Sequence, residues 1–240
     1  MNSLKEIYLN GIYLNKMFFY NNKYNFIFVY TPLIVSAIPE NIRHYILGGK
    51  DNEVNEYKNK KNILPHLCYS LNIKHAIGEE EWNNNYTFGI VRSPFDYLID
   101  MYEFFTEGPP DRVAWCRGIK ETKDAVKEQY RLKSRGFRNW LLNDMDYDYL
   151  HSSPFCGPRL TSQMVWLSEV NDVFCMEQTT PLLNKLFELS RITLPSFQGV
   201  PSQKDLKIKR ASYFGRDNEL IDLVTGSFKQ EIERFGFSPE

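Results

Sequence analysis

Short apolar runs alternate along the chain with longer stretches of helical periodicity. Two runs, residues 25–30 (NFIFVY) and 86–91 (YTFGIV), are dense in aromatic and β-branched residues and show no regular polar alternation. Such runs are typical of strands buried on both faces of a parallel sheet. A third run, residues 171–176, is expected to form another strand.

Helices are predicted between and after these strands. Pro39 suits a first helical position and begins a predicted helix over residues 39–46. Further helices are expected from residue 95 to about 105, over about 120–132, around Leu182 and Leu186, and from about 218 to 235. Strands that alternate with helices predict an α/β fold with a mostly parallel central sheet flanked by helices.

The whole chain of 240 residues is expected to form one domain. Residues 1–24 would be a leading extension, in which Asn10-Gly11 suits the type I′ turn of a small hairpin over residues 6–15. Residues 50–61 are rich in Lys and Asn and are expected to form a solvated surface loop.

Composition excludes several classes of partner. Lys and Arg number 29 against 30 Asp and Glu, so no global field favours nucleic acid or an anionic membrane as partner. The four cysteines form no CxxC pair, and the histidines do not have metal-ligand spacing, so neither a disulfide scaffold nor a metal is expected. The N-terminal residues contain no long apolar run, so we expect no membrane span and a cytoplasmic location.

Arg92 is the first candidate for ligand chemistry. It follows a predicted buried strand, and ligands of open α/β sheets bind beyond the carboxyl ends of the strands. A guanidinium can hold a phosphate through two parallel hydrogen bonds. The alternative is an ion pair between Arg92 and Asp96 on the next helical turn.

Residues 88–105 (FGIVRSPFDYLIDMYEFF) resemble the strand–Val-Arg-Asn-Pro–helix segment of sulfotransferases, in particular the bacterial and carbohydrate branch of that superfamily. Residues 74–87 are similar to the family's Lys-His-Ala/Ser-Thr and Gly-Glu-Glu-x-Trp stretch. Residues 170–189 and 207–237 resemble later family segments in the same order. The resemblance is poorest over residues 108–136.

This resemblance implies a P-loop-type three-layer fold and the transfer of a sulfuryl group from 3′-phosphoadenosine 5′-phosphosulfate (PAPS) to a hydroxyl or amine. The acceptor would be a small molecule or a carbohydrate, and residues 108–136 would shape its pocket. By position, His75 would be the general base. The residues that would contact the nucleotide are Ser36, Arg92, Ser93, Lys207, Lys209 and Arg210.

The chain departs from the family pattern in the 5′-phosphosulfate loop. The family reads Pro-Lys-x-Ala/Gly-x-Thr-Ser, whereas residues 32–39 read PLIVSAIP. Leu33 replaces the lysine that would steady the phosphosulfate, and Pro39 removes a backbone N–H. The other substitutions are Ala37 and Ile38 for the hydroxyl pair, Asp100 for a serine on the 3′-phosphate, and Cys175 for an arginine.

Three hypotheses follow. The chain is a PAPS-dependent sulfotransferase with an altered loop, a catalytically inactive sulfotransferase-fold binding or interaction protein, or an enzyme that uses a different nucleotide on the same scaffold. His75, Arg92 and the basic residues 207–210 favour the first. The apolar loop and Asp100, whose charge would repel a phosphate, favour the other two.

Overall fold

A computed structural model describes residues 18–21, 24–31, 70–116, 119–144, 162–191 and 202–239. The predicted hairpin over residues 6–15, the loop over residues 32–39 with Ser36, the helix over residues 39–46 and the charged stretch at residues 50–61 lie outside these ranges. Predictions about them therefore stay predictions.

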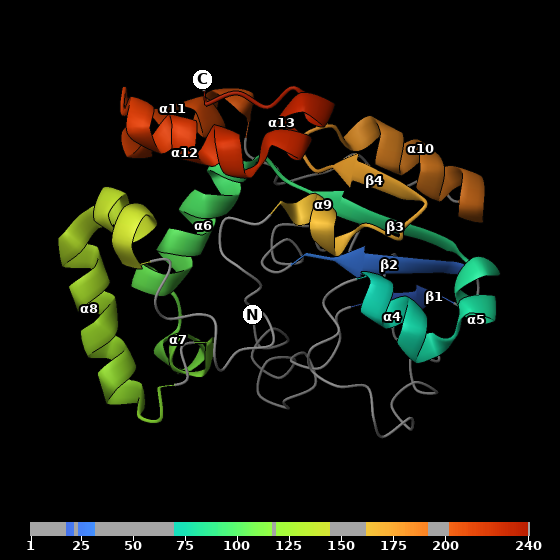
Figure 1. Cartoon of the computed structure of the whole chain (residues 1–240), viewed down its shortest axis with the longest axis horizontal. Coiled ribbons are helices and arrows are strands. Elements are labelled where there is room, and N and C mark those ends of the chain that lie inside the picture. The colour runs from blue at the N-terminus through green and yellow to red at the C-terminus, as the bar shows by residue number, and fades with distance from the viewer. Residues whose placement is uncertain are drawn as a thin grey trace.

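The described residues form a four-stranded sheet in the order β1-β2-β3-β4, with bounds Phe18–Asn21, Phe26–Tyr30, Tyr86–Val91 and Asp172–Cys175. β2, β3 and β4 are parallel, whereas β1 pairs antiparallel with β2 (Figure 1). The prediction of an α/β fold with a mostly parallel sheet is confirmed. The antiparallel strand β1 was not predicted.

Helices cover both faces of the sheet. On the aliphatic face, Ile27, Val29 and Val173 pack with a cluster that includes Trp82, Trp166 and Leu167. These cluster residues come from α5 (Glu79–Asn83), α9 (Gln163–Trp166) and the turn after α9, and α4 (Ser70–Ile77) adds Ile73 and Ile77.

The opposite face of the sheet is aromatic. The ring of Phe88 lies 5.2 Å from that of Phe28 and 5.9 Å from those of Tyr86 and Phe174. Lys185 of α10 (Thr179–Ser190) lies 4.7 Å from the centre of the Tyr86 ring. Because both faces are covered, β2 and β3 consist mostly of apolar residues.

A second helical region begins where β3 ends. Helix α6 (Pro94–Glu107) runs from the carboxyl end of β3 to α7 (Pro110–Cys116) and α8 (Thr122–Asn139) (Figure 1). A π-helical turn, Trp140–Asp144, follows α8. The described part of residues 108–136, where the resemblance is poorest, thus forms helices that pack against α6 around the buried side chains of Phe95, Tyr102 and Trp140.

The C-terminal segment contains α11 (Gln203–Tyr213), α12 (Asn218–Ser227) and α13 (Lys229–Phe235). The prediction of one helix over residues 218–235 is wrong, because the backbone leaves helical geometry at Phe228. This residue is fully buried, and its ring meets Tyr97 edge-on at 6.5 Å. The break thus accompanies burial of an aromatic side chain against α6.

Close packing of α9 against the sheet requires a glycine in β3. A Cβ atom built on Gly89 would lie 2.4 Å from a methyl carbon of Leu167. Leu167 is itself buried against the sheet, so it has little room to move.

Within the described residues, no helix combines the length and apolarity needed to cross a membrane.

Candidate functional site

The candidate site lies where β3 and β4 end. Since the two strands are parallel neighbours, their carboxyl ends meet at one edge of the sheet (Figure 1). Arg92 and Ser93 connect β3 to α6, and Glu177 follows β4 by one turn. This is the edge at which open α/β sheets bind ligands.

Side chains from α9 and from the end of β4 fix the backbone of this connection. The N–H of Arg92 donates to Gln163 Oε1 at 3.1 Å, and Gln163 Nε2 donates to the carbonyl of Arg92 at 2.8 Å. The N–H of Ser93 donates to Glu177 Oε1 at 2.9 Å. Both polar groups of the Arg92 backbone are therefore held by one amide side chain.

The Arg92 guanidinium is buried and already paired with acids. Nη1 forms an ion pair and hydrogen bond with Asp100 Oδ2, and Nε lies 3.8 Å from Glu177 Oε1. The alternative prediction of an ion pair with Asp96 is wrong, because Arg92 pairs with Asp100, one helical turn further along α6. The arginine is 8% exposed, whereas its partner Asp100 is about one-third exposed.

Asp96 instead binds Arg210 of α11. Arg210 Nε and Nη2 donate to the two carboxylate oxygens at 2.8 and 2.6 Å, and Nη1 donates to the carbonyl of Ser238 at 3.0 Å. The hydrogen bond with Asp96 raises the pKa of Arg210 against the opposing effect of burial. Both side chains are almost completely buried, so this pair joins α11 to α6.

Lys209, the neighbour of Arg210, reaches the Arg92 cluster through shared carboxylates. Its Nζ lies 3.1 Å from Asp100 Oδ1 and 2.6 Å from Glu103 Oε2. Burial alone would lower the pKa of Lys209, but Glu103 and Asp100 together outweigh burial and raise it. The structure thus brings Arg92 and Lys209 to the same carboxylate, Asp100.

Other predicted residues lie apart from this cluster or make no described contact with it. Lys207 is exposed, and no hydrogen bond or ion pair joins it to another described residue. His75 on α4 is also exposed, and its neighbour Lys74 contacts Glu169 at 3.2 Å and Glu79 at 3.6 Å. The described contacts therefore do not join His75 to Arg92.

Ser93 has an unusual environment. It is fully buried, and its hydroxyl has no hydrogen-bond partner in the described part of the chain. A buried hydroxyl without a partner is unfavourable and calls for an explanation such as a ligand or water molecule.

Sequence reasoning missed the acids that surround these cations. Asp96, Glu103 and Glu177 were not among the predicted site residues. Asp96 lies in the first turn of α6 and Glu177 lies just after β4, whereas Glu103 lies in the C-terminal half of α6. Burial raises the pKa of Glu177, while its contacts with Cys175, Ser93 and Arg92 lower it in part. The thiol of Cys175 donates to Glu177 Oε2 at 3.0 Å, and burial raises the pKa of that thiol.

The site is a chain of alternating charges: Glu177, Arg92, Asp100, Lys209 and Glu103. Asp100 lies between the two cations, and its two carboxylate oxygens accept one hydrogen bond from each.

Comparisons with protein-family models, with curated protein sequences and with solved structures give no significant match to this chain. The assignment of a function therefore rests on the residues and their geometry.

Proposed function

We propose that this chain is a sulfotransferase-like protein that binds a 3′-phosphorylated adenine nucleotide, with the 3′-phosphate held by Arg92 and Lys209. The observation that carries the proposal is the pairing of both cations with one carboxylate at the carboxyl ends of β3 and β4. The sequence resemblance assigns the 3′-phosphate to Arg92, and the basic segment that contains Lys209 to the same nucleotide.

Three features of the site support anion binding. Arg92 and Lys209 can both donate hydrogen bonds to one oxyanion, because they already do so to Asp100. The Arg92 backbone is held rigidly by Gln163, which lowers the entropy cost of placing its side chain. The buried Ser93 hydroxyl is a further donor without a described partner.

Asp100 reduces the affinity of this site for phosphate. Its carboxylate carries the same sign of charge as the ligand and occupies the donors that the ligand would use. Both Asp100 and Lys209 are about one-third exposed, so the carboxylate can turn towards water when a stronger anion arrives. Binding of a nucleotide would thus exchange one anion for another.

The transfer step that the resemblance implies has definite requirements. An acceptor oxygen or nitrogen attacks the sulfur atom while the bond from sulfur to the 5′-phosphate oxygen breaks, and that oxygen leaves with the bonding electron pair. A base takes the acceptor's proton, a role assigned to His75 by position. Leu33 stands where a lysine would stabilise the leaving phosphate, so the transfer step has less support than nucleotide binding.

A second candidate is a binding or interaction protein that has the same scaffold but does not catalyse transfer. It is favoured by the fact that carboxylates already satisfy Arg92, Lys209 and Arg210. An enzyme that uses a different nucleotide is the third candidate. Calorimetric titration with other nucleotides distinguishes it from the first two.

Titration calorimetry with adenosine 3′,5′-bisphosphate (PAP), the product of the donor, tests the binding proposal. We expect saturable binding that is weakened at least about tenfold by Lys209→Met, equivalent to 1.4 kcal/mol. Arg138→Met is a matched control, because Arg138 pairs with Asp217 and Glu219 elsewhere on the surface. No binding at millimolar PAP would refute nucleotide binding at this site.

Transfer is tested separately by following PAP release from PAPS in the presence of hydroxyl and amine acceptors. Release that depends on the acceptor and is lost in His75→Gln would support the enzyme. PAP binding without any such release would support the non-catalytic protein instead.

A further inference from the structure

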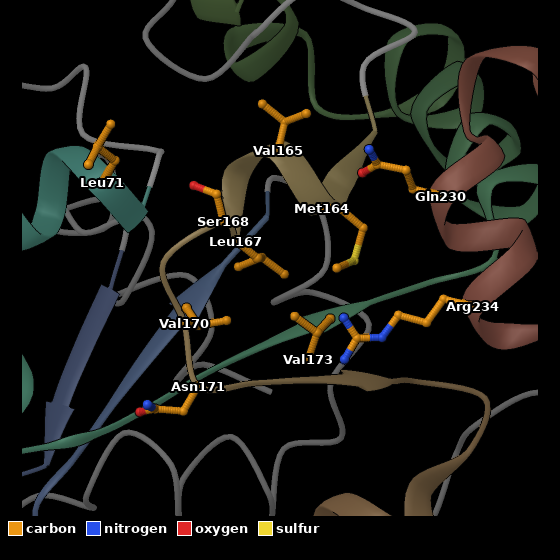
Figure 2. Close-up of a pocket in the computed structure, with 10 residues that line it drawn as sticks. All are labelled: Leu71, Met164, Val165, Leu167, Ser168, Val170, Asn171, Val173, Gln230 and Arg234. Carbon is orange, nitrogen blue, oxygen red and sulfur yellow. The ribbon is translucent and has the colours of Figure 1, made fainter.

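A groove on the aliphatic face of the sheet lies apart from the charged cluster. It has a volume of about 720 Å³, within the range of about 300–1,000 Å³ that is usual for small-molecule sites. α4, α9, β4, the connection between α9 and β4, and α13 contribute its lining (Figure 2). The lining residues are Leu71, Met164, Val165, Leu167, Ser168, Val170, Asn171, Val173, Gln230 and Arg234.

The groove combines a buried apolar floor with apolar side chains that are open to water. Leu167 and Val173 are buried on the sheet. Leu71 and Val165 are 43% and 45% exposed, which is unusual for large aliphatic side chains in this structure. Apolar surface that remains exposed within a concave site is a common feature of binding sites.

One cation points into this apolar groove. Figure 2 shows the Arg234 side chain extending from α13 so that its guanidinium lies near Val173. Among the described residues, no ion pair joins Arg234 to a carboxylate, and its guanidinium lies 5.3 Å from the centre of the ring of Phe235, its neighbour in sequence.

The groove contains no acidic lining residue among the described positions, and nearby acids in sequence have other partners. Glu169 binds Lys74, and Glu233 lies 3.6 Å from Lys229. Glu231 is buried and accepts hydrogen bonds from Ser162 and from the backbone of Gln163. Arg234 therefore supplies the groove with a positive charge that the described residues do not neutralise.

We propose that this groove binds a small amphipathic carboxylate, with its apolar body on Leu167, Val173 and Met164 and its carboxylate on Arg234. A guanidinium matches the geometry of a carboxylate, whose two oxygens can accept parallel hydrogen bonds. Gln230 lies one turn before Arg234 on α13 and also lines the groove, where its Oε1 accepts a hydrogen bond from the Ser162 hydroxyl at 3.4 Å (Figure 2). The groove shares no lining residue with the charged cluster, so this proposal is independent of the proposed function.

Octanoate is a suitable probe, with octan-1-ol as the uncharged control of the same chain length. Protein labelled with ¹³C in its methionine methyl groups reports the site directly, because Met164 lines the groove whereas Met101 packs in the helical region around α6. We expect octanoate to shift the Met164 signal in a saturable way and to leave the Met101 signal unchanged. Octanol should bind at least about tenfold more weakly, because it lacks the charge.

Two variants test the role of the cation. Arg234→Gln should reduce octanoate affinity about tenfold without changing octanol affinity, whereas Arg216→Gln, an exposed arginine outside the groove, should change neither. Val165→Glu places a like charge at the exposed mouth and should also weaken octanoate binding. An unchanged Met164 signal, equal affinity for octanoate and octanol, or no effect of Arg234→Gln would each overturn the proposal.

Discussion

The ion pairs of this protein differ greatly in burial, and we therefore expect them to differ in what they contribute to stability. The Arg210–Asp96 pair is bidentate and almost completely buried, whereas Arg138 pairs with Asp217 and Glu219 at a surface where it is half exposed. Loss of one partner from a buried pair leaves an uncompensated charge in a medium of low polarity. Loss of an exposed partner leaves a charge that water can solvate.

Arg210→Met should therefore lower the free energy of unfolding by about 3–5 kcal/mol. Arg138→Met removes a similar side chain and should cost less than about 1 kcal/mol. Urea unfolding followed by circular dichroism measures both values. Equal losses in the two variants would mean that the buried pair does not join α11 to α6 as described.

Glu177 should make stability depend on pH. Burial raises the pKa of this carboxyl in the folded state, so between its unfolded pKa of about 4.3 and its folded value the folded chain binds more protons. The contribution of Glu177 to the free energy of unfolding must then fall as pH rises through that window. Glu177→Gln removes the titrating group and keeps an acceptor oxygen for the Ser93 N–H.

The stability of Glu177→Gln relative to the unaltered protein should consequently increase as pH rises from about 4.3 towards neutrality. Urea unfolding at a series of pH values gives this difference directly. A difference that stays constant or decreases over the series would contradict a raised pKa at Glu177.

At the scale of elements, the strands were the most predictable part of the fold. Residues 86–91 form β3 as predicted, because an apolar run followed by Arg-Ser-Pro is too short for a buried helix and ends where a strand would end. The break at Phe228 was missed because residues 218–235 have helical periodicity throughout, and the burial of Phe228 against Tyr97 is a long-range contact that this periodicity does not reveal. β1 was missed because it is short and lies in a segment treated as an extension.

The charged cluster was predictable only in part for a related reason. Asp96 and Asp100 are four residues apart and therefore lie on one face of α6, so the sequence alone could not decide which of them faces Arg92. α11, which is distant in the sequence, places Arg210 against Asp96. Arg92 therefore pairs with Asp100 instead. Long-range packing thus decided a choice that local spacing left open.

The contact between β3 and the turn after α9 can be tested at Gly89. A methyl group there would collide with the buried side chain of Leu167, so Gly89→Ala should destabilise the protein by about 1–3 kcal/mol. Leu167→Ala alone should also destabilise it, by about 2–5 kcal/mol, because it leaves a cavity.

The double variant, Gly89→Ala with Leu167→Ala, tests whether these losses share one cause. If the methyl group added at position 89 fills part of the space that the Leu167 side chain vacates, the double variant should lose less stability than the sum of the single variants. Strictly additive losses in urea unfolding would show that the two positions do not interact.

At the scale of the whole molecule, two candidate ligand-binding regions lie against different parts of the same sheet. The charged cluster lies at the carboxyl ends of β3 and β4, and the amphipathic groove lies on the aliphatic face. α9 contributes to both, because Gln163 holds the backbone of Arg92 while Met164 lines the groove. The fold therefore offers a candidate nucleotide site and a separate apolar site.

Arg92 and Lys209 are proposed to form a 3′-phosphate site that the Asp100 carboxylate now occupies. Asp100→Ser removes the competing carboxylate and introduces the serine that the proposed likeness to sulfotransferases would place there. Calorimetric titration should compare PAP with adenosine 5′-monophosphate, which lacks the 3′-phosphate, for the unaltered protein and this variant, with circular dichroism to confirm folding.

We expect Asp100→Ser to bind PAP at least about tenfold more tightly than the unaltered protein does. Adenosine 5′-monophosphate should show no such gain, and adding Lys209→Met to the variant should remove it. If a folded Asp100→Ser variant binds PAP no better than the unaltered protein, or gains equally for both nucleotides, the assignment of a 3′-phosphate site to Arg92 and Lys209 is wrong.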